Sequence, residues 1–329
     1  MPFQILSLSG GGYLGLYTAA VLAEIEALYQ KPIIDSFDMI VGTSVGGITA
    51  LGLSAGTPAS EILDSFYVDG PDIFGSSRPP RGGISGFLNV VRGIRKARYD
   101  PNPLRGVIER IVGAETVMAN LRRPTLVPAV NLTKGGPRVF KTGHHPDFKF
   151  DWRLNVVDVA LATSAAPTYF PLHRIGSELF ADGGMFANSP DMIGIHEAEH
   201  FLDIDREDIH LLSIGTTTTK FAFSSSVSQQ IGAYGWMKDE RLPTVMIGCQ
   251  QALADHMVQH ILKERYLRID REQSPDQKVE LALDCASENA KRDLSAMAAQ
   301  SAMEMSNDRR LEDMLSHSAP PFSFINAGG

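Results

Sequence analysis

Two consecutive units of strand, glycine turn and helix near the start of the chain constrain its fold most strongly. The apolar run Phe3–Leu8 leads into Gly10-Gly11-Gly12, and apolar residues then recur at helical spacing over about residues 14–29. A second run, residues 37–41, leads into Gly42-Thr43-Ser44-Val45-Gly46 and another apolar helical stretch. This order is typical of a parallel sheet covered by helices.

The rest of the chain continues the alternation. Strands are predicted at residues 125–131, 138–142, 178–181 and 209–214. Helices are predicted at residues 156–163, 191–201, 244–263 and 288–315. Because the 329 residues contain no internal repeat and no long linker, we expect one α/β domain over residues 1–329. It would consist of a core at about 3–216 with a mostly parallel sheet, and a helical C-terminal extension at about 217–329.

Charge and cysteine content limit the classes of protein. Lys and Arg total 30 against 38 Asp and Glu, a net charge of −8, so the molecule as a whole has no electrostatic affinity for a nucleic acid polymer. Two cysteines are too few for a disulfide framework, and no basic segment precedes an apolar run at the start. We therefore expect a cytoplasmic protein. The uncharged stretch 39–60 could cross a bilayer by length, but its glycines, serines and threonines favour a buried strand, turn and helix.

The sequence Gly42-Thr43-Ser44-Val45-Gly46 matches G-x-S-x-G. In this motif a nucleophilic serine occupies a sharp turn between a strand and a helix, and glycine neighbours make room for the turn. The helix N-terminus then stabilises negative charge near the hydroxyl. A glycine-rich turn with a structural serine is the alternative, and the strand before and helix after favour the nucleophile.

The first glycine turn can supply backbone donors. Gly10-Gly11-Gly12-Tyr13-Leu14-Gly15 follows a strand and opens a helix, so its N–H groups can converge on one space without obstruction by side chains, as an oxyanion requires. The same residues satisfy the dinucleotide fingerprint G-x-G-x-x-G, for which Asp35 or Asp38 would be the acidic partner about 20 residues on. A nucleotide-binding module without catalysis therefore remains an alternative.

A third glycine-flanked site follows a later strand. In Asp182-Gly183-Gly184 the carboxylate would emerge at the strand end, where it could accept the serine proton as general base. The alternative is an aspartate in an ordinary turn.

Together these segments resemble the patatin-like phospholipases, over about residues 3–216. The resemblance is carried by residues 9–15, 42–46 and 182–184, by the apolar segment 162–171, by Ala187-Asn188-Ser189-Pro190 and by residues 212–216. It implies a three-layer α/β/α fold and a Ser-Asp dyad that hydrolyses acyl esters of lipids.

Mapped onto this chain, the resemblance implies a role for each residue of the site. Ser44 would be the nucleophile on the elbow that Gly42 and Gly46 flank, and Asp182 would be the base. The oxyanion hole would comprise the amides of Gly11 and Gly12, with a share from Gly10. One departure is visible, because the family's glycine loop usually carries an arginine where this chain has Leu14.

The resemblance also implies the partners. The substrate would be a membrane phospholipid, cleaved without a metal or an organic cofactor, with peripheral membrane contact in the active state. Bacterial relatives of this size include phospholipase effectors that cyclic nucleotides switch on in defence against phage, so a cyclic nucleotide activator is a further hypothesis. Assembly into an oligomer is compatible with the sequence.

Histidines offer two rival chemistries. His196 and His200 lie in an H-E-x-x-H motif on a predicted helix, where two histidines on one face could bind zinc as in a metallopeptidase, although no recognisable third ligand follows. A histidine could instead complete a triad with Ser44, the candidates being His144, His145, His173 and His210. His256 and His260 are interpreted as surface or packing residues.

A basic segment separates the elbow from the aspartate. Between residues 78 and 98 there are six basic side chains and no acidic one, interleaved with apolar residues at helical spacing. Such a segment can lie on an anionic bilayer, cover a lipid site or contact a phosphate ligand, and Arg92, Arg95 and Lys96 are its candidate contacts. A packed amphipathic helix with solvated arginines is the alternative.

Overall fold

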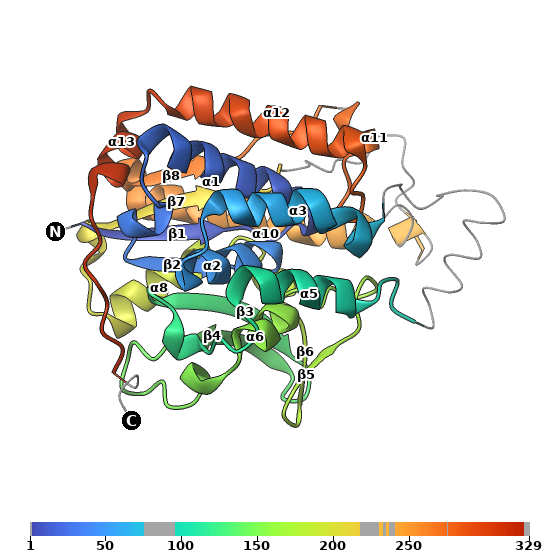
Figure 1. Cartoon of the computed structure of the whole chain (residues 1–329), viewed down its shortest axis with the longest axis horizontal. Helices are drawn as coiled ribbons and strands as arrows, with labels where there is room; N and C mark the ends of the chain where they lie inside the picture. The colour runs from blue at the N-terminus through green and yellow to red at the C-terminus, as the bar shows by residue number, and fades with distance from the viewer. Residues whose placement is uncertain are drawn as a thin grey trace.

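A single mixed sheet forms the centre of the molecule (Figure 1). The computed structural model describes residues 2–75, 96–217, 230–232, 235–236, 241–274 and 276–325. Within these, eight strands form the order β5-β6-β3-β2-β1-β7-β8, with β4 paired to β3. The strands are β1 (Phe3–Leu8), β2 (Met39–Gly42), β3 (Thr125–Asn131), β4 (Gly136–Lys141), β5 (His173–Ile175), β6 (Glu178–Asp182), β7 (Ile209–Ile214) and β8 (Tyr266–Ile269).

The direction of the strands brings three loops to one edge. β3, β2, β1, β7 and β8 are parallel neighbours, whereas β4, β5 and β6 run antiparallel to their partners. Leu8 and Gly42, the last residues of β1 and β2, are in register, so the loops that follow leave the sheet side by side. β6 approaches from the opposite direction and its last residue, Asp182, pairs with Ala129 of β3. The segments proposed for catalysis therefore converge at the carboxyl edge of the parallel strands.

Helices cover both faces of the sheet. They are α1 (Gly15–Tyr29), α2 (Val45–Ala55), α3 (Ala59–Phe74), α5 (Pro101–Val112), α6 (Val156–Thr163), α7 (Gly184–Ala187), α8 (Asp191–Phe201), α10 (Arg241–Leu262), α11 (Gln277–Glu280), α12 (Glu288–Met305) and α13 (Arg309–Ser316). On one face α1, α2 and α6 pack on the strands, with α3, α5 and α12 outside them (Figure 1). On the other face α8 and α10 pack on β1, β2, β7 and β8. The three-layer α/β/α fold that the resemblance implied is confirmed.

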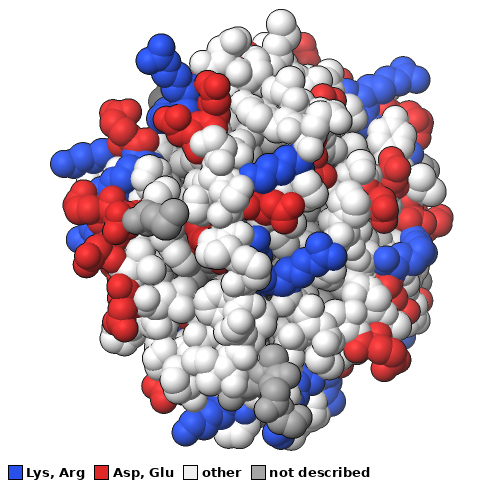
Figure 2. Space-filling model, turned by 60° about the vertical axis from the view of Figure 1, so that its left-hand side comes forward, with Lys and Arg blue, Asp and Glu red and all other residues white. Residues whose placement is uncertain are grey.

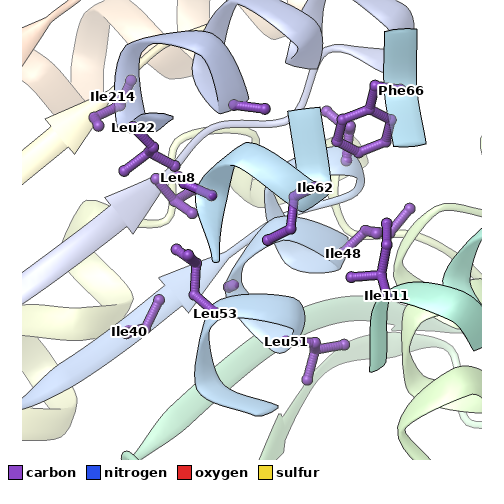
Figure 3. Packing of buried hydrophobic residues seen from close by; sticks show 14 of the residues in the cluster. Leu8, Leu22, Ile40, Ile48, Leu51, Leu53, Ile62, Phe66, Ile111 and Ile214 are labelled. Carbon is purple, nitrogen blue, oxygen red and sulfur yellow. The ribbon is translucent and has the colours of Figure 1, made fainter. Parts of the chain in front are cut away.

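The alternation of side chains along each strand explains the two layers. Leu6 and Leu8 of β1 belong to the larger apolar cluster, whereas Ile5 belongs to the smaller cluster beneath α8 and α10. Figure 3 shows Leu8 together with Ile40 and other buried side chains of the larger cluster. Strands buried on both faces are mostly apolar, which is why these segments read as short apolar runs, although β1 also buries Gln4 and Ser7.

One predicted element is wrong in detail. The helix expected over 288–315 is two helices, α12 and α13, separated at residues 306–308. The side chain of Asp308 accepts a hydrogen bond from the N–H of Arg310, which caps the start of α13. The periodic pattern continues across the break because both helices bury apolar residues, so the sequence pattern alone did not reveal the cap.

The segment after residue 217 extends the sheet as well as covering it. α10, α12 and α13 supply the helices that the sequence predicts there, and β8 pairs in parallel with β7 at the edge of the sheet. α12 packs along α1, where the Tyr17 hydroxyl and Ser301 Oγ lie 2.8 Å apart in a buried hydrogen bond. The C-terminal part is thus built into the same core as the N-terminal strands.

The uncharged stretch 39–60 forms β2, the turn after it and α2, all inside the α/β layers. Among the described residues no helix combines the length and apolar character needed to cross a bilayer. On the face seen in Figure 2 the acidic and basic side chains are interspersed, and no extended patch of one sign forms on that side.

Candidate active site

Ser44 occupies a sharp turn between β2 and α2. Its backbone has φ 55° and ψ −124°, a sparsely populated conformation for a residue with a side chain. A Cβ at Gly42 would overlap the carbonyl of Gly46, and one at Gly46 would overlap the carbonyl of Leu8. The N–H of Ser44 donates to Thr163 Oγ1 at 3.0 Å, which holds the strained turn from the side of α6. Both glycines of G-x-S-x-G are therefore required by space.

Asp182 lies against Ser44 at the end of β6. Ser44 Oγ donates to Asp182 Oδ2 at 2.7 Å, and the N–H of Gly184 donates to the other oxygen, Oδ1, at 2.6 Å. The two side chains belong to residues that are 8% and 5% exposed, respectively. Burial raises the pKa of Asp182 to about 6, while the Ser44 hydroxyl and the Gly184 N–H act in the opposite direction. At neutral pH the carboxylate is thus ionised and a stronger base than an exposed aspartate.

The glycine loop lies directly over the serine. A Cβ at Gly10 would come within 3.2 Å of Ser44 Cβ, so the backbone there touches the nucleophile. The Gly10 N–H donates to the Asn188 carbonyl at 2.9 Å, and the share predicted for Gly10 in the oxyanion hole is therefore wrong. In the described part of the chain, the N–H groups of Gly11 and Gly12 have no acceptor. Of the three glycine-loop amides, those of Gly11 and Gly12 remain as candidate donors to an oxyanion.

Several polar residues around the loop were not assigned roles from the sequence. Asn188 Nδ2 and Thr216 Oγ1 both donate to the Gly10 carbonyl, and Thr163 Oγ1 contacts the elbow. Asn188 and Thr216 belong to the segments that carried the resemblance, which was the available signal. Leu283, whose carbonyl accepts the Tyr13 N–H at 2.8 Å, lies in no motif and could be found only in the fold.

Leu14 is buried in the larger apolar cluster, in the turn that opens α1. At this position, where the resemblance led us to expect an arginine, the chain thus provides packing and no charge.

The H-E-x-x-H segment is on α8 as predicted, with the His196 and His200 rings stacked 5.3 Å apart. Its glutamate is committed elsewhere, because Glu197 is buried and accepts hydrogen bonds from Lys141 Nζ at 2.5 Å and His144 Nε2 at 2.9 Å. Among the residues that the structure describes, no group of three potential metal ligands occurs. The geometry gives the zinc hypothesis no third ligand and no available general base.

The other histidines do not complete a triad. His144 is bonded to Glu197, and His173 Nε2 lies 3.1 Å from Asp158 Oδ1. The hydroxyl of Ser44 is bonded to Asp182. His256 and His260 lie exposed on α10, in agreement with a surface position.

The dinucleotide hypothesis fails on the position of the acidic partner. Asp38 Oδ2 accepts the N–H of Gln4 at 2.8 Å, at the start of β1. The glycine loop leaves the other end of the same strand, about 20 Å away at the usual rise per residue. Asp35 lies in the short turn Ile33–Ser36 before β2. Neither carboxylate can reach a ribose on the loop.

The basic segment is the remaining sequence candidate. Arg92 and Arg95 lie outside the described residues, and Lys96 is exposed where the description resumes. Their membrane or ligand contact stays a prediction.

The fold and the elbow have the strand–turn–helix arrangement of an α/β hydrolase. The family model described as "Patatin-like phospholipase" matches residues 6–193. The chain belongs to the patatin-like phospholipase family.

Its relatives match over most of their length. A Pseudomonas aeruginosa protein named cGAMP-activated phospholipase is 40% identical over 320 residues, which cover 96% of this chain and 93% of the relative. A Vibrio cholerae protein of the same name is 37% identical over 322 residues, which cover 92% of this chain and 90% of the relative. Among solved structures, VipD from Legionella pneumophila covers 91% of this chain and 67% of its own at a TM-score of 0.40 and 16% identity, a similarity too low to bear on the site.

Proposed function

We propose that this enzyme hydrolyses ester bonds of membrane glycerophospholipids through Ser44 and Asp182. The observation that carries the proposal is the 2.7 Å hydrogen bond from the Ser44 hydroxyl to a buried carboxylate, beneath backbone amides that have no other described acceptor. A carboxylate can serve directly as the general base for a serine when no histidine intervenes.

The proposed cycle has two halves. Ser44 Oγ attacks the ester carbonyl while Asp182 accepts its proton, and the N–H groups of Gly11 and Gly12 bind the oxyanion of the tetrahedral intermediate. Asp182 then returns the proton to the leaving alcohol, which leaves an acyl-Ser44 ester. In the second half Asp182 takes a proton from water, the resulting hydroxide attacks the acyl carbonyl, and the proton goes back to Ser44 as the fatty acid leaves.

We extend the proposal to regulation and to the membrane. The relatives named cGAMP-activated phospholipases support activation of this chain by a cyclic nucleotide. We propose a role in defence against phage on the family resemblance alone. Because the substrate resides in a bilayer, the active enzyme would contact the membrane peripherally. Arg92, Arg95 and Lys96 are the proposed contacts for anionic headgroups or for the phosphates of the activator.

The decisive experiment is mass spectrometry of a mixed-lipid digest with and without cGAMP. Wild type should release fatty acids and lysophospholipids, and Ser44→Ala should lower the rate by about 10⁴-fold or more because it removes the nucleophile. A fluorophosphonate probe should label Ser44 in wild type only. Turnover by a folded Ser44→Ala protein comparable to that of wild type would disprove the serine mechanism.

A further inference from the structure

The carbonyl oxygen of Gly10 is held from two sides. Asn188 Nδ2 donates to it at 3.1 Å and Thr216 Oγ1 donates at 2.9 Å. Both residues are buried, and they come from separate segments, the loop after α7 and the loop after β7. A carbonyl that accepts two buried side-chain hydrogen bonds has little freedom to rotate.

This restraint sets the direction of the next amide. A peptide unit is planar and trans, so the Gly10 carbonyl and the Gly11 N–H point in opposite directions. In a run of three glycines no side chain opposes rotation of the peptide about its flanking bonds. The two hydrogen bonds on the carbonyl therefore determine where the Gly11 N–H points, and by polarising the amide they strengthen it as a donor.

Asn188 also ties the glycine loop to the aspartate. Its backbone carbonyl accepts the N–H of Gly10 at 2.9 Å. A Cβ at Gly10 would lie 2.5 Å from Asn188 Oδ1, and a Cβ at Gly184 would lie 2.8 Å from the same atom. Asn188 Oδ1 is thus wedged between the two loops, and the N–H of Gly184 is the group that binds Asp182 Oδ1. One side chain sets the spacing between the oxyanion donors and the base.

We propose that Asn188 and Thr216 are positioning residues of the oxyanion site. They hold the Gly10–Gly11 peptide so that the Gly11 N–H faces the carbonyl oxygen of the ester that Ser44 attacks. Neither residue touches the substrate, and the inference rests on the proposed serine mechanism. Their effect belongs to the transition state, since the restrained N–H matters most when charge develops on that oxygen.

The test separates the hydroxyl of Thr216 from its volume. Thr216→Val keeps the shape and removes the donor, whereas Thr216→Ser keeps the donor and removes a methyl group. With a soluble chromogenic acyl ester, assayed with and without cGAMP, Thr216→Val should lower kcat by about tenfold and change KM by less than about twofold. Thr216→Ser should restore kcat to near the wild-type value. The drop is smaller than loss of a whole oxyanion donor because Asn188 still holds the carbonyl.

A second readout reports the oxyanion itself. A trifluoromethyl ketone adds to the serine as a tetrahedral oxyanion, so its inhibition constant should rise in Thr216→Val by the same factor as kcat/KM falls. Adding Asn188→Ser should increase the loss to about 10²-fold or more, as for a missing donor. Thr57→Val is the matched control, because Thr57 Oγ1 donates to the Ile111 carbonyl between α2 and α5, away from the loop.

The outcomes distinguish this inference from the proposed function. Full turnover by Ser44→Ala would reject the mechanism on which both rest. If Ser44→Ala is inactive while Thr216→Val keeps wild-type kcat and ketone affinity, the positioning role is wrong. It is also wrong if Thr216→Val changes only KM, if Thr216→Ser fails to restore kcat, or if Thr57→Val lowers kcat equally.

Discussion

The nucleophile side and the base side of the active site are built in different ways. Ser44 and the glycine loop follow the parallel strands β2 and β1, and their geometry depends on backbone space that a Cβ would fill. Asp182 arrives on the antiparallel strand β6, and burial makes it a stronger base, while two hydrogen bonds hold the carboxylate in place and act against that rise in pKa. Backbone sterics determine the geometry of the nucleophile side, and electrostatics determine the basicity of the base side. We therefore expect substitutions on the first side to lower stability and substitutions on the second to lower turnover.

Among substitutions that keep the Ser44 hydroxyl, the largest effect on turnover is expected on the base side. Asp182→Asn keeps the size of the side chain and its acceptor for the Gly184 N–H, but it cannot take the proton of Ser44. We expect kcat to fall by about 10²- to 10⁴-fold, the usual contribution of a general base. Steady-state kinetics with a soluble ester measure this directly. Retention of more than a tenth of the wild-type kcat would show that another group is the base.

The same variant should be more stable than wild type at alkaline pH. Because burial raises the pKa of Asp182 from 3.8 to about 6, the ionised carboxylate costs up to about 3 kcal/mol of folding free energy above pH 6. The cost is absent below the unfolded pKa and appears as pH rises through the folded one. Denaturant unfolding should therefore show Asp182→Asn stabilised at alkaline pH, with the difference vanishing in acid. A variant that is less stable at every pH would contradict the raised pKa.

On the nucleophile side we expect substitutions to lower the stability of the fold. Gly42→Ala would place a methyl group against the Gly46 carbonyl, and a clash with rigid backbone should cost about 3 kcal/mol of stability. Gly106→Ala is the matched control, since Gly106 lies within α5 with open space around its Cα. That change should stabilise by about 0.5–1 kcal/mol, because alanine favours a helix. Denaturant midpoints of the two variants give the contrast, and equal shifts would refute the steric argument.

The smallest effect is the pH dependence of the wild type. A base with a pKa of about 6 must be deprotonated to act, so kcat/KM should be level above neutrality and fall about tenfold per pH unit well below that pKa. The profile should be taken with a soluble ester, and each sample returned to neutral pH to show that the protein stayed folded. A midpoint near the unshifted value of 3.8 would mean that the carboxylate is better solvated than its burial implies.

Sequence patterns predicted six- and seven-residue strands even where polar residues interrupt them, as Gln4 and Ser7 do in β1, and missed shorter strands and a helix that contains glycine and proline. β1, β3 and β7 were predicted with the observed bounds. β8 was missed because Arg268 interrupts its four residues; its guanidinium is satisfied inside the fold by Ser213 Oγ at 2.8 Å and Asp270 Oδ2 at 2.7 Å. α3 contains Gly70 and Pro71, which obscure a helical pattern.

The sequence by itself determined the turns. The glycines at positions 42 and 46, the loop of three glycines and the strands before them follow from steric demands that act between close neighbours in the chain. Such demands leave a signature in the residue types, which is why Ser44 could be singled out without a fold.

Only the tertiary structure determined which residues of the site contact one another. The contact between Ser44 and Asp182 joins residues 138 positions apart, and the raised pKa of the carboxyl exists only because the core excludes water from it. In the same packing the Gly10 N–H donates to the Asn188 carbonyl. Asp38 lies at the end of β1 that is opposite to the glycine loop. Desolvation and the choice of hydrogen-bond partner depend on atoms that come together only when the chain is folded, so no local pattern encodes them.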